Sequence, residues 1–409
     1  MFPQNGEKIP KIRFDGFTYD WEQRKWMNSV DISTEMVDPA SGEYDDMPHI
    51  APGNIESFTG RVLDNVRTVK EEQLISGKFR FRPDDVVYGK INPQLGKYFY
   101  ASVDGLTSAD AYVFKGKNGI TQKFLFSLLQ TSDFFKYSVS VSKRSGMPKI
   151  NRDELNAYAF LAPSEEEQDK IGNFLLELDH LITLHQRKCE QTKKLKKYML
   201  QKMFPQNGEK IPKIRFDGFT YDWEQRKLGD MGSTFTGLSG KTKENFGHGD
   251  AQFITYMNVF SNPVANLEMT EAVEIDAKQN CVKKGDVFFT TSSETPEEVG
   301  MSCVMPENKD NIYLNSFCFG YRPTEKFDLD YLAYVLRADS FRQEMTFLAQ
   351  GISRYNISKN KVMEVSIPIP NLEEQTMVGR YFSNLDHLIT LHQRKCDELK
   401  KMKKYMLQN

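Results

Sequence analysis

Two long stretches of the chain place hydrophobic residues at alternating spacings of three and four, the pattern of a helix that buries one stripe. The first runs from about residue 165 to 202, contains one glycine and no proline, and follows Pro163 and the capping-box pattern Ser164–Glu167. The second closes the chain, over 372–409. Stripes of this length are typical of a coiled-coil seam. The predicted seam residues are Ile171, Phe174, Leu178, Leu181, His185 and Leu195 in the first helix, and Val378, Tyr381, Leu385, Leu388, His392 and Leu399 in the second.

The chain is an internal duplication. Met1–Lys25 recurs unchanged as Met203–Lys227, and Leu178–Cys189 recurs as Leu385–Cys396, whereas the segments between them diverge. A period of about 200 residues is too long for a solenoid, whose units repeat every ~20–50 residues. The predicted parts are a lead segment 1–25, a first variable domain 26–163, a first helix 164–202, a repeated lead segment 203–227, a second variable domain 228–371 and a second helix 372–409.

The repeated order predicts how the helices pair. Two equivalent helices related by a pseudo-twofold axis would run antiparallel, and about 35 residues at 1.5 Å each give a rod of roughly 50 Å. If the final helix packs beside the first lead segment as the internal helix meets the internal lead segment, the two termini lie close together. The alternative is that each helix packs only on its own domain.

Both variable domains alternate hydrophobic and polar residues in short runs, which indicates β-structure. Phe79–Arg82 alternates, and Val86-Val87-Tyr88 matches Val287-Phe288-Phe289 of the other copy. The predicted fold class is therefore mixed α+β, with two variable domains joined by two long antiparallel coiled-coil helices.

Basic, amide and hydroxyl side chains gather in loops after the matched strands and before the long helices. Arg, Lys, Asn and Gln read base edges, and Ser and Thr suit phosphates, so these loops are candidate nucleic-acid contacts; the alternative is ordinary solvated surface. The candidate DNA-binding residues are Arg80, Arg82, Lys90, Asn92, Gln94, Lys97, Lys143, Arg144 and Lys149 in the first domain, and Lys241, Thr242, Lys243, Thr290, Thr291, Ser292, Ser293, Arg354, Tyr355 and Asn356 in the second.

Catalytic motifs are missing from the sequence. Gly237–Thr242 resembles a phosphate loop but fails the GxxxxGK[ST] spacing, and GxSxG, HExxH and the adenine-methyltransferase tetrapeptide [DN]PP[YFW] do not occur. We therefore predict no catalytic residue and no metal ligand. His185 and His392 with Cys189 and Cys396 could bind zinc, but interior polar residues are the favoured interpretation. The lysine clusters 193, 194, 196, 197 and 400, 401, 403, 404 are interpreted as a solvated helix face, with a phosphate or acidic-partner contact as the alternative.

Composition narrows the class of protein. The chain has 409 residues, 39% of them hydrophobic, and no apolar run approaches the ~18–20 residues of a membrane span, so no membrane partner is expected. Its five cysteines form no CxxC pair, which favours a reducing cytoplasm. A formal charge of −2 excludes a uniformly basic nucleic-acid coat but not local basic patches.

Several motifs together resemble the specificity (S) subunit of type I restriction-modification systems. They are the lead segment Lys11–Lys25 with its copy, and the segments Leu161–Gln168 and Ile369–Gln375 that open the long helices. The resemblance covers nearly the whole chain and includes the order of its parts.

The resemblance implies two target recognition domains held apart by an antiparallel helix pair, in a non-catalytic subunit. It also implies double-stranded DNA with a bipartite target as partner, two methyltransferase subunits docked on the helices, and endonuclease subunits joined through them. S-adenosylmethionine, ATP and magnesium would then belong to the partner subunits, so no cofactor is expected in this chain. The competing hypothesis is a coiled-coil protein-interaction scaffold without sequence-specific DNA binding.

Overall fold

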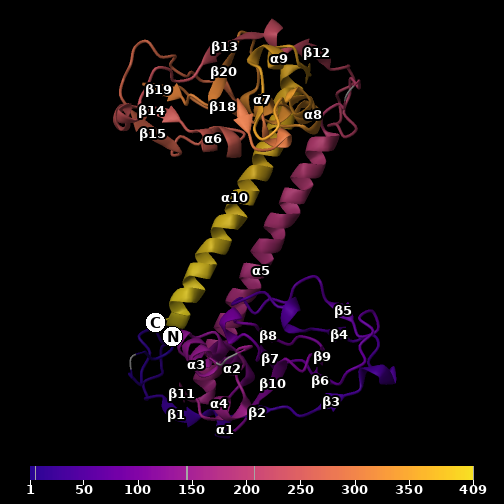
Figure 1. The fold of residues 1–409 in the computed structure, drawn as a ribbon, viewed down its shortest axis with the longest axis vertical. Helices are drawn as coiled ribbons and strands as arrows, with labels where there is room; N and C mark the ends of the chain where they lie inside the picture. The colour runs from indigo at the N-terminus through magenta and orange to yellow at the C-terminus, as the bar shows by residue number, and fades with distance from the viewer. Residues whose placement is uncertain (5, 144–145, 207, 409) are drawn as a thin grey trace. The chain divides into compact units, whose positions relative to one another are not determined.

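The structure is a computed structural model that describes residues 1–4, 6–143, 146–206 and 208–408. The chain forms two compact units (Figure 1). Unit 1 comprises Met1–Arg187 and His392–Asn409, and unit 2 comprises Lys188–Leu391. In the described part of the chain, no helix has the length and apolar character needed to cross a membrane.

Unit 1 is built on a four-stranded sheet of order β2-β10-β7-β8, whose strands pair antiparallel. Its strands are β1 (Glu22–Lys25), β2 (Val30–Ile32), β3 (Met36–Val37), β4 (Pro48–His49), β5 (Arg67–Thr68), β6 (Lys78–Phe81), β7 (Val86–Gly89), β8 (Tyr98–Tyr100), β9 (Gly105–Thr107), β10 (Ala111–Gly116) and β11 (Ala159–Ala162). Its helices are α1 (Trp26–Ser29), α2 (Gln122–Leu129), α3 (Ser132–Val141), α4 (Arg152–Asn156) and the first part of α5 (Glu165–Lys202).

The core of unit 1 lies between this sheet and the helices. All four residues of β7 are buried, as its run of apolar residues predicts for a central strand. Trp26 is fully buried, and its ring lies 5.0 Å from that of Phe114 on β10 and 5.6 Å from that of Phe134 on α3. Aromatic packing therefore joins the sheet to α3 and fixes where the loops between them emerge.

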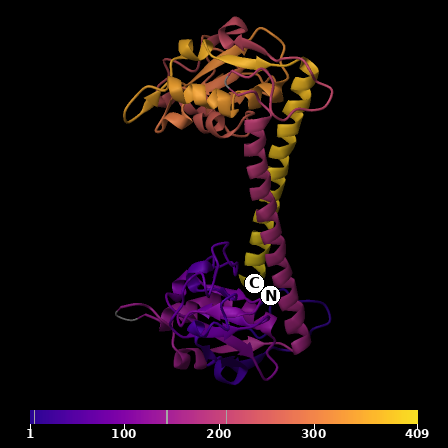
Figure 2. The same cartoon turned by 90° about the vertical axis from the view of Figure 1, so that its right-hand side faces the viewer.

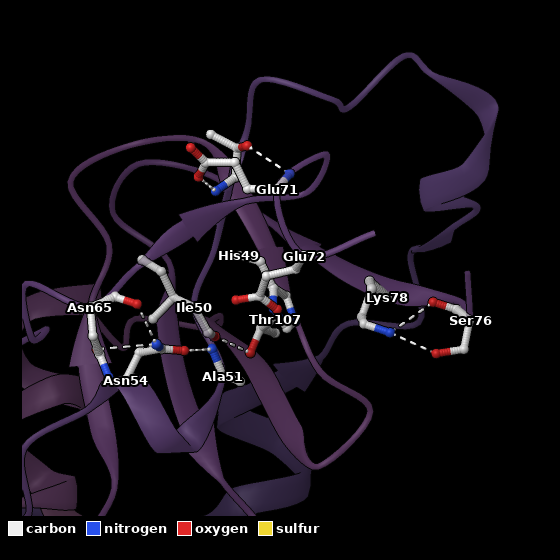
Figure 3. Close-up of polar contacts among 11 residues, drawn as sticks. His49, Ile50, Ala51, Asn54, Asn65, Glu71, Glu72, Ser76, Lys78 and Thr107 are labelled. Atoms are coloured by element: carbon white, nitrogen blue, oxygen red, sulfur yellow. Dashed lines mark hydrogen bonds and ion pairs between the residues drawn. The ribbon is translucent and has the colours of Figure 1, made fainter. Parts of the chain in front are cut away.

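A second sheet of unit 1, of order β3-β6-β9-β4-β5, carries buried polar groups (Figure 3). His49 is 5% exposed and its Nδ1 lies 2.7 Å from a carboxylate oxygen of Glu72. Lys78 is 7% exposed and donates to the carbonyl and hydroxyl oxygens of Ser76, at 2.8 and 2.7 Å. The Thr107 hydroxyl donates to the Ile50 carbonyl at 2.7 Å. Since buried polar groups are costly without partners, these bonds hold the short strands in register.

Unit 2 repeats the main sheet, with order β13-β20-β16-β18, and adds a three-stranded sheet of order β15-β14-β19. Its strands are β12 (Glu224–Lys227), β13 (Gly232–Thr236), β14 (Phe246–Ile254), β15 (Thr270–Val273), β16 (Val287–Thr290), β17 (Ser292–Ser293), β18 (Ser302–Val304), β19 (Ile312–Leu314), β20 (Cys318–Pro323), β21 (Tyr355–Asn356) and β22 (Ser366–Ile369). Its helices are α6 (Tyr256–Ser261), α7 (Leu329–Val335), α8 (Asp339–Leu348), α9 (Lys359–Met363) and the first part of α10 (Leu372–Gln408).

Each lead segment is attached to the start of a long helix by a strand pair and by an Arg–Glu ion pair, which we call the Arg–Glu clip. Strand β1 pairs antiparallel with β11, and β12 pairs with β22. Arg13 forms a bidentate ion pair with Glu167 at 2.7 and 2.8 Å, and Arg215 repeats it with Glu374 at 2.7 and 2.9 Å. Both glutamates are 1% exposed. Helix α5 begins at Glu165 as predicted, and the Ser164 hydroxyl accepts from the Glu167 amide. The capping box is nevertheless only half formed, because the Glu167 carboxylate binds Arg13.

Helices α5 and α10 run antiparallel and contact each other within each unit, as predicted. In unit 1, Lys403 donates to Asp179, and the Nδ1 atoms of His185 and His392 lie 3.0 Å apart. In unit 2, Lys196 donates to both carboxylate oxygens of Asp386, at 2.6 and 2.7 Å. The amino group of Met1 donates to the Met406 carbonyl at 2.6 Å, so the predicted proximity of the two ends is confirmed, and both ends lie together in Figures 1 and 2.

The predicted seam needs correction at one position in each helix. Leu195 and Leu388 are each 41% exposed, so their assignment to the seam was wrong. The seam there runs one position later: its members are Ile182, Cys189 and Lys196 in α5, and Ile389, Cys396 and Lys403 in α10. An ideal helix drifts by about 20° per heptad, so an apolar stripe two residues wide does not fix which member faces the partner. The remaining predicted seam residues are buried or half-buried: Ile171, Phe174, Leu178, Leu181, His185, Val378, Tyr381, Leu385, His392 and Leu399.

The seam also corrects the interpretation of the lysine clusters. Lys403 is 7% exposed and Lys196 has a side chain that is 20% exposed, so these two are interior ion-pair partners, not members of a solvated face. Burial lowers the pKa of both amines, and their carboxylate partners oppose that effect. Among the described residues no group of three or more His, Cys, Asp or Glu side chains could hold a metal ion.

Candidate nucleic-acid interface

In unit 1, two of the predicted loops lie side by side at the end of the central strand β7. Ile91 bridges Lys149, the Asn92 amide donates to the Pro148 carbonyl at 2.8 Å, and the Ile150 amide donates to the Lys90 carbonyl at 3.1 Å. We call the described parts of these loops, Lys90–Lys97 and Gly146–Lys149, the edge of unit 1. Asn92 and Gly96 adopt positive φ angles of 50° and 55°, which turn the chain back toward β8.

The edge of unit 1 carries concentrated positive charge. The Lys90 amine lies 5.0 Å from the centre of the Tyr112 ring, and the Arg152 guanidinium lies 5.9 Å from it. Partial burial and the nearby charges of Lys149 and Arg152 lower the pKa of Lys90, while Asp110 opposes this shift. Clustered cations that share one surface suit a phosphate backbone. Arg152 was not among the predicted contacts. It is the first residue of α4, as Lys359 is the first residue of α9 in the second copy, and this match between the copies was a signal that could have found it.

In unit 2, the equivalent loops pair as two short strands. Ser292 pairs with Asn356 and Ser293 with Tyr355, and the Ile357 amide donates to the Thr291 carbonyl at 3.0 Å. We call Thr291–Gly300 and Gln350–Asn356 the edge of unit 2. Thr291 fixes its start, because its hydroxyl donates to the Phe317 carbonyl at 2.8 Å. The structure therefore brings together predicted residues that are more than 60 positions apart in the sequence.

Two arginines that the sequence analysis missed hold this second edge. Arg342 donates to the carbonyls of Glu297, Val299 and Gly300, at 2.7, 2.6 and 2.7 Å. Arg337 donates to four carbonyls between Val259 and Ser302, at 2.8 to 3.1 Å. Burial lowers the pKa of both side chains to about 10, so both remain charged at neutral pH. Arg337 lies in the turn between α7 and α8, and Arg342 lies in α8 among other polar residues, so residue type gives no signal for either role.

Several predicted contacts lie elsewhere or are already engaged. Arg80 forms a bidentate pair with Asp104 at 3.0 and 2.6 Å, and Arg82 forms one with Glu35 at 2.7 Å through both bonds. These hydrogen bonds raise the pKa of both guanidiniums. Both guanidiniums are already ion-paired, and the two arginines lie on and just after β6 rather than on the edge. Their assignment as DNA contacts was therefore wrong.

Three further predictions are corrected by burial or by ion pairing. Lys97 donates to the Ile55 carbonyl from a half-buried position. Lys241 has a side chain 11% exposed and lies 3.2 Å from Asp276. Thr290 is fully buried, and its hydroxyl accepts from the Met301 amide at 2.9 Å. Each side chain serves the fold of its own domain, so none is placed to meet DNA.

The other predicted residues keep accessible positions or line the edges. Asn92 and Gln94 are hydrogen-bonded to each other at 3.2 Å on the edge of unit 1, and Lys143 is exposed. Arg144 lies outside the described residues. Thr242 and Lys243 are exposed and lie in the short turn that precedes β14. Ser292 and Ser293 are 6% and 8% exposed, Tyr355 and Asn356 form the second strand of the edge of unit 2, and Arg354 immediately precedes this strand.

Comparisons with known proteins match this architecture. The family model for the type I restriction modification DNA specificity domain matches residues 36–194 and again 221–401. The chain belongs to this family. Both matched segments contain an edge and most of a long helix, so each unit carries one copy of the family's plan.

Relatives and solved structures support the assignment. The chain is 32% identical to the EcoDI specificity subunit of Escherichia coli, over 42% of this chain and 38% of that relative. It is 25% identical to the putative MjaX specificity subunit of Methanocaldococcus jannaschii, over 98% of this chain and 95% of that relative. Its fold resembles that of a type I restriction-modification S subunit from M. genitalium, with a TM-score of 0.62, 12% identity and coverage of 98% and 97% of the two chains.

Proposed function

We propose that this chain is the DNA specificity subunit of a type I restriction-modification complex, and that each unit reads one half of a bipartite target. The observation that carries the proposal is that each unit has an edge, and that the two edges are built in the same way but carry different side chains. Both edges follow the central strand and precede the long helix, yet one presents Lys, Asn and Gln and the other Ser, Glu and Arg. Different side chains on one frame are what two unlike half-sites require.

The repeated parts support a common role in spacing and docking. The lead segments, long helices and their Arg–Glu clips are alike in both units. We assign to the helix pair the spacing of the half-sites and the docking of two methyltransferase subunits, through which endonuclease subunits join. The chain itself would have no catalytic role, and S-adenosylmethionine, ATP and magnesium would belong to the partners. A cytoplasmic location fits a DNA-binding role and five cysteines that form no disulfide among the described residues.

The test is to express the chain with the methyltransferase subunits of its own system and to sequence adenine methylation in the host genome. The expected result is one motif with two specified parts and an unspecified gap. A matched variant with one heptad added to both helices should widen the gap and leave both parts unchanged. Methylation without sequence preference, or DNA retention that ignores both sequence and salt, would contradict the proposal and favour a protein-interaction scaffold.

A further inference from the structure

An open cleft of about 660 Å³ adjoins the edge of unit 2. Residues of α6, including Tyr256, form one wall, and Ser292, Glu294, Glu298 and Arg354 of the edge form the other. The Tyr256 hydroxyl donates to the Ser292 carbonyl at 2.8 Å, so the two walls are joined at one end. This bond ties the two walls together, and polar groups line one side of the cleft.

Both walls are held by the buried arginines. Arg337 binds the carbonyls of Val259, Phe260 and Asn262, which close the C-terminal end of α6. Arg342 binds the carbonyls that follow Glu294 in the edge, from Glu297 to Gly300. Rigid support of this kind is expected where side chains must be placed accurately against a ligand.

Some polar side chains along the cleft have no hydrogen-bond or ion-pair partner within the described part of the chain. Ser292 is 6% exposed and lines the cleft, and its hydroxyl makes no hydrogen bond within the described part of the chain. Over the same residues, the Glu294 carboxylate and the Arg354 guanidinium have no ion-pair partner, whereas Glu298 accepts from the Ser293 hydroxyl at 3.1 Å. Glu294 is thus the carboxylate available to a ligand.

A carboxylate at a DNA-facing edge requires a specific reason, because phosphates repel it. The base-edge groups that attract a carboxylate are the exocyclic amino donors, above all N4 of cytosine and also N6 of adenine. The equivalent loop of unit 1, Lys90–Lys97, contains no Asp or Glu, whereas Thr291–Glu298 contains three glutamates. The difference points to a requirement of the second half-site alone.

We infer that Glu294 is a specificity-determining residue that accepts a hydrogen bond from the exocyclic amino group of one cytosine or adenine in the second half-site. Arg354 lies on the same cleft and supplies positive charge for the adjoining phosphate. This inference rests on the proposed function. It adds the class of base that one unit reads.

The test uses the chain in complex with its methyltransferase subunits and a duplex carrying the two-part target. Each cytosine of the second half-site is replaced in turn by 2-pyrimidinone, which lacks the 4-amino group, and each adenine by purine, which lacks the 6-amino group. One replacement should weaken binding of the unmodified complex about ten-fold. Glu294→Ala should bind that duplex and the natural one equally, and Glu294→Gln, which keeps an acceptor oxygen, should restore part of the discrimination.

Glu307→Ala is the matched control, since Glu307 is an exposed carboxylate of the same unit outside the cleft. It should retain the ten-fold discrimination, and replacements in the first half-site should affect all variants alike. Unchanged discrimination in Glu294→Ala, or no second-half-site replacement that weakens the unmodified complex, would overturn the inference while leaving the two-part target intact. Binding without sequence preference in the unmodified complex would instead overturn the proposed function and this inference together.

Discussion

Units 1 and 2 share several contacts where their sequences repeat, such as the Arg–Glu ion pair, and differ in their interiors and edges, where their sequences diverge. The Met1 amino group donates to the Met406 carbonyl at 2.6 Å, and the Met203 amide donates to the Met199 carbonyl at 2.8 Å. Met199 and Met406 occupy equivalent places in the repeated sequence Tyr-Met-Leu-Gln, so the two lead segments begin with equivalent contacts.

In the interiors of the two units, a tyrosine and a serine exchange places between a strand and a helix. In unit 1 a tyrosine, Tyr98, lies on β8 and a serine, Ser127, lies on α2. In unit 2 the register places Ser302 on β18 opposite Phe289, as Tyr98 lies opposite Tyr88, and Tyr334 lies on α7. Both tyrosines are buried beside the aspartate of the helix ion pair, which raises their pKa in addition to the larger effect of burial. Equivalent space is thus filled from different elements.

The edges are supported by different forces. In unit 1 the Phe58 ring meets that of Phe135 at 5.4 Å, and the Phe58 amide donates to the Gly96 carbonyl. In unit 2 the residue at the place of Phe135 is Arg342, which holds three edge carbonyls. Apolar packing tolerates small shifts, whereas several hydrogen bonds from one guanidinium fix a backbone conformation. The comparison teaches that the constant frame sets where an edge lies, and the variable interior sets how it is held.

Replacing one partner of the helix ion pair should have the largest effect. Asp386→Ala leaves the Lys196 amine unpaired in a mostly buried position and should lower the free energy of unfolding of unit 2 by about 3–5 kcal/mol. Urea unfolding followed by hydrogen exchange of α7 amides measures it. The double variant Lys196→Met with Asp386→Leu is the control and should restore most of the loss. A loss below about 1 kcal/mol would contradict a structural role for the pair.

Removal of the guanidinium clamp should come next. Arg342→Met leaves three carbonyls without their donor and should cost about 3 kcal/mol, with faster hydrogen exchange in 297–300. Phe135→Leu, at the equivalent place in unit 1, keeps apolar packing and should leave exchange in 93–96 nearly unchanged. Equal effects in both edges would show that the two are supported in the same way, against the comparison drawn above.

The tyrosine exchange predicts an unequal pair of small changes. Tyr334→Phe removes a 2.7 Å hydrogen bond to the Asp386 carboxylate and should cost about 2 kcal/mol. Tyr98→Phe should cost less than about 0.5 kcal/mol, because its hydroxyl has no hydrogen bond among the described residues. Unfolding free energies of both variants, measured in parallel, decide the point. Similar costs would mean that both phenols bind their aspartates in solution.

The last prediction concerns the reactivity of the cysteine thiols and involves no change in the free energy of unfolding. Cys281 of unit 2 is exposed and should react with a thiol reagent at pH 8, while the other four cysteines are buried. Burial raises the pKa of Cys303 and Cys318 to about 12, so almost none of either thiol is thiolate at that pH. Mass spectrometry of labelled peptides should therefore find one modified site, in unit 2. Rapid labelling of Cys303 would show that the sheet of unit 2 opens.

Much of the fold was predictable from local pattern. The start of α5 near residue 165, the matched strands after Asp85 and Asp286, and the antiparallel helix pair follow from periodicity and repetition. The residues of the candidate interface were harder to predict from the sequence. Arg80 and Arg82 were assigned to DNA from their residue type and position. Their ion-pair partners Asp104 and Glu35 lie 24 and 47 residues away in the sequence, so no local pattern could reveal them. Arg337 and Arg342 were missed for the same reason, since carbonyl partners leave no trace in residue identity.

The sequence by itself determined the duplication, the helices and the places where the two copies differ, because repetition and hydrophobic period are properties of residue order. Only the tertiary structure decided which side chains remain available at each edge. Availability depends on contacts between residues distant in sequence: an ion pair or a buried carbonyl can occupy a side chain whose type alone suits DNA. For the same reason Glu294, unremarkable in the sequence, stands out once the cleft beside it is known.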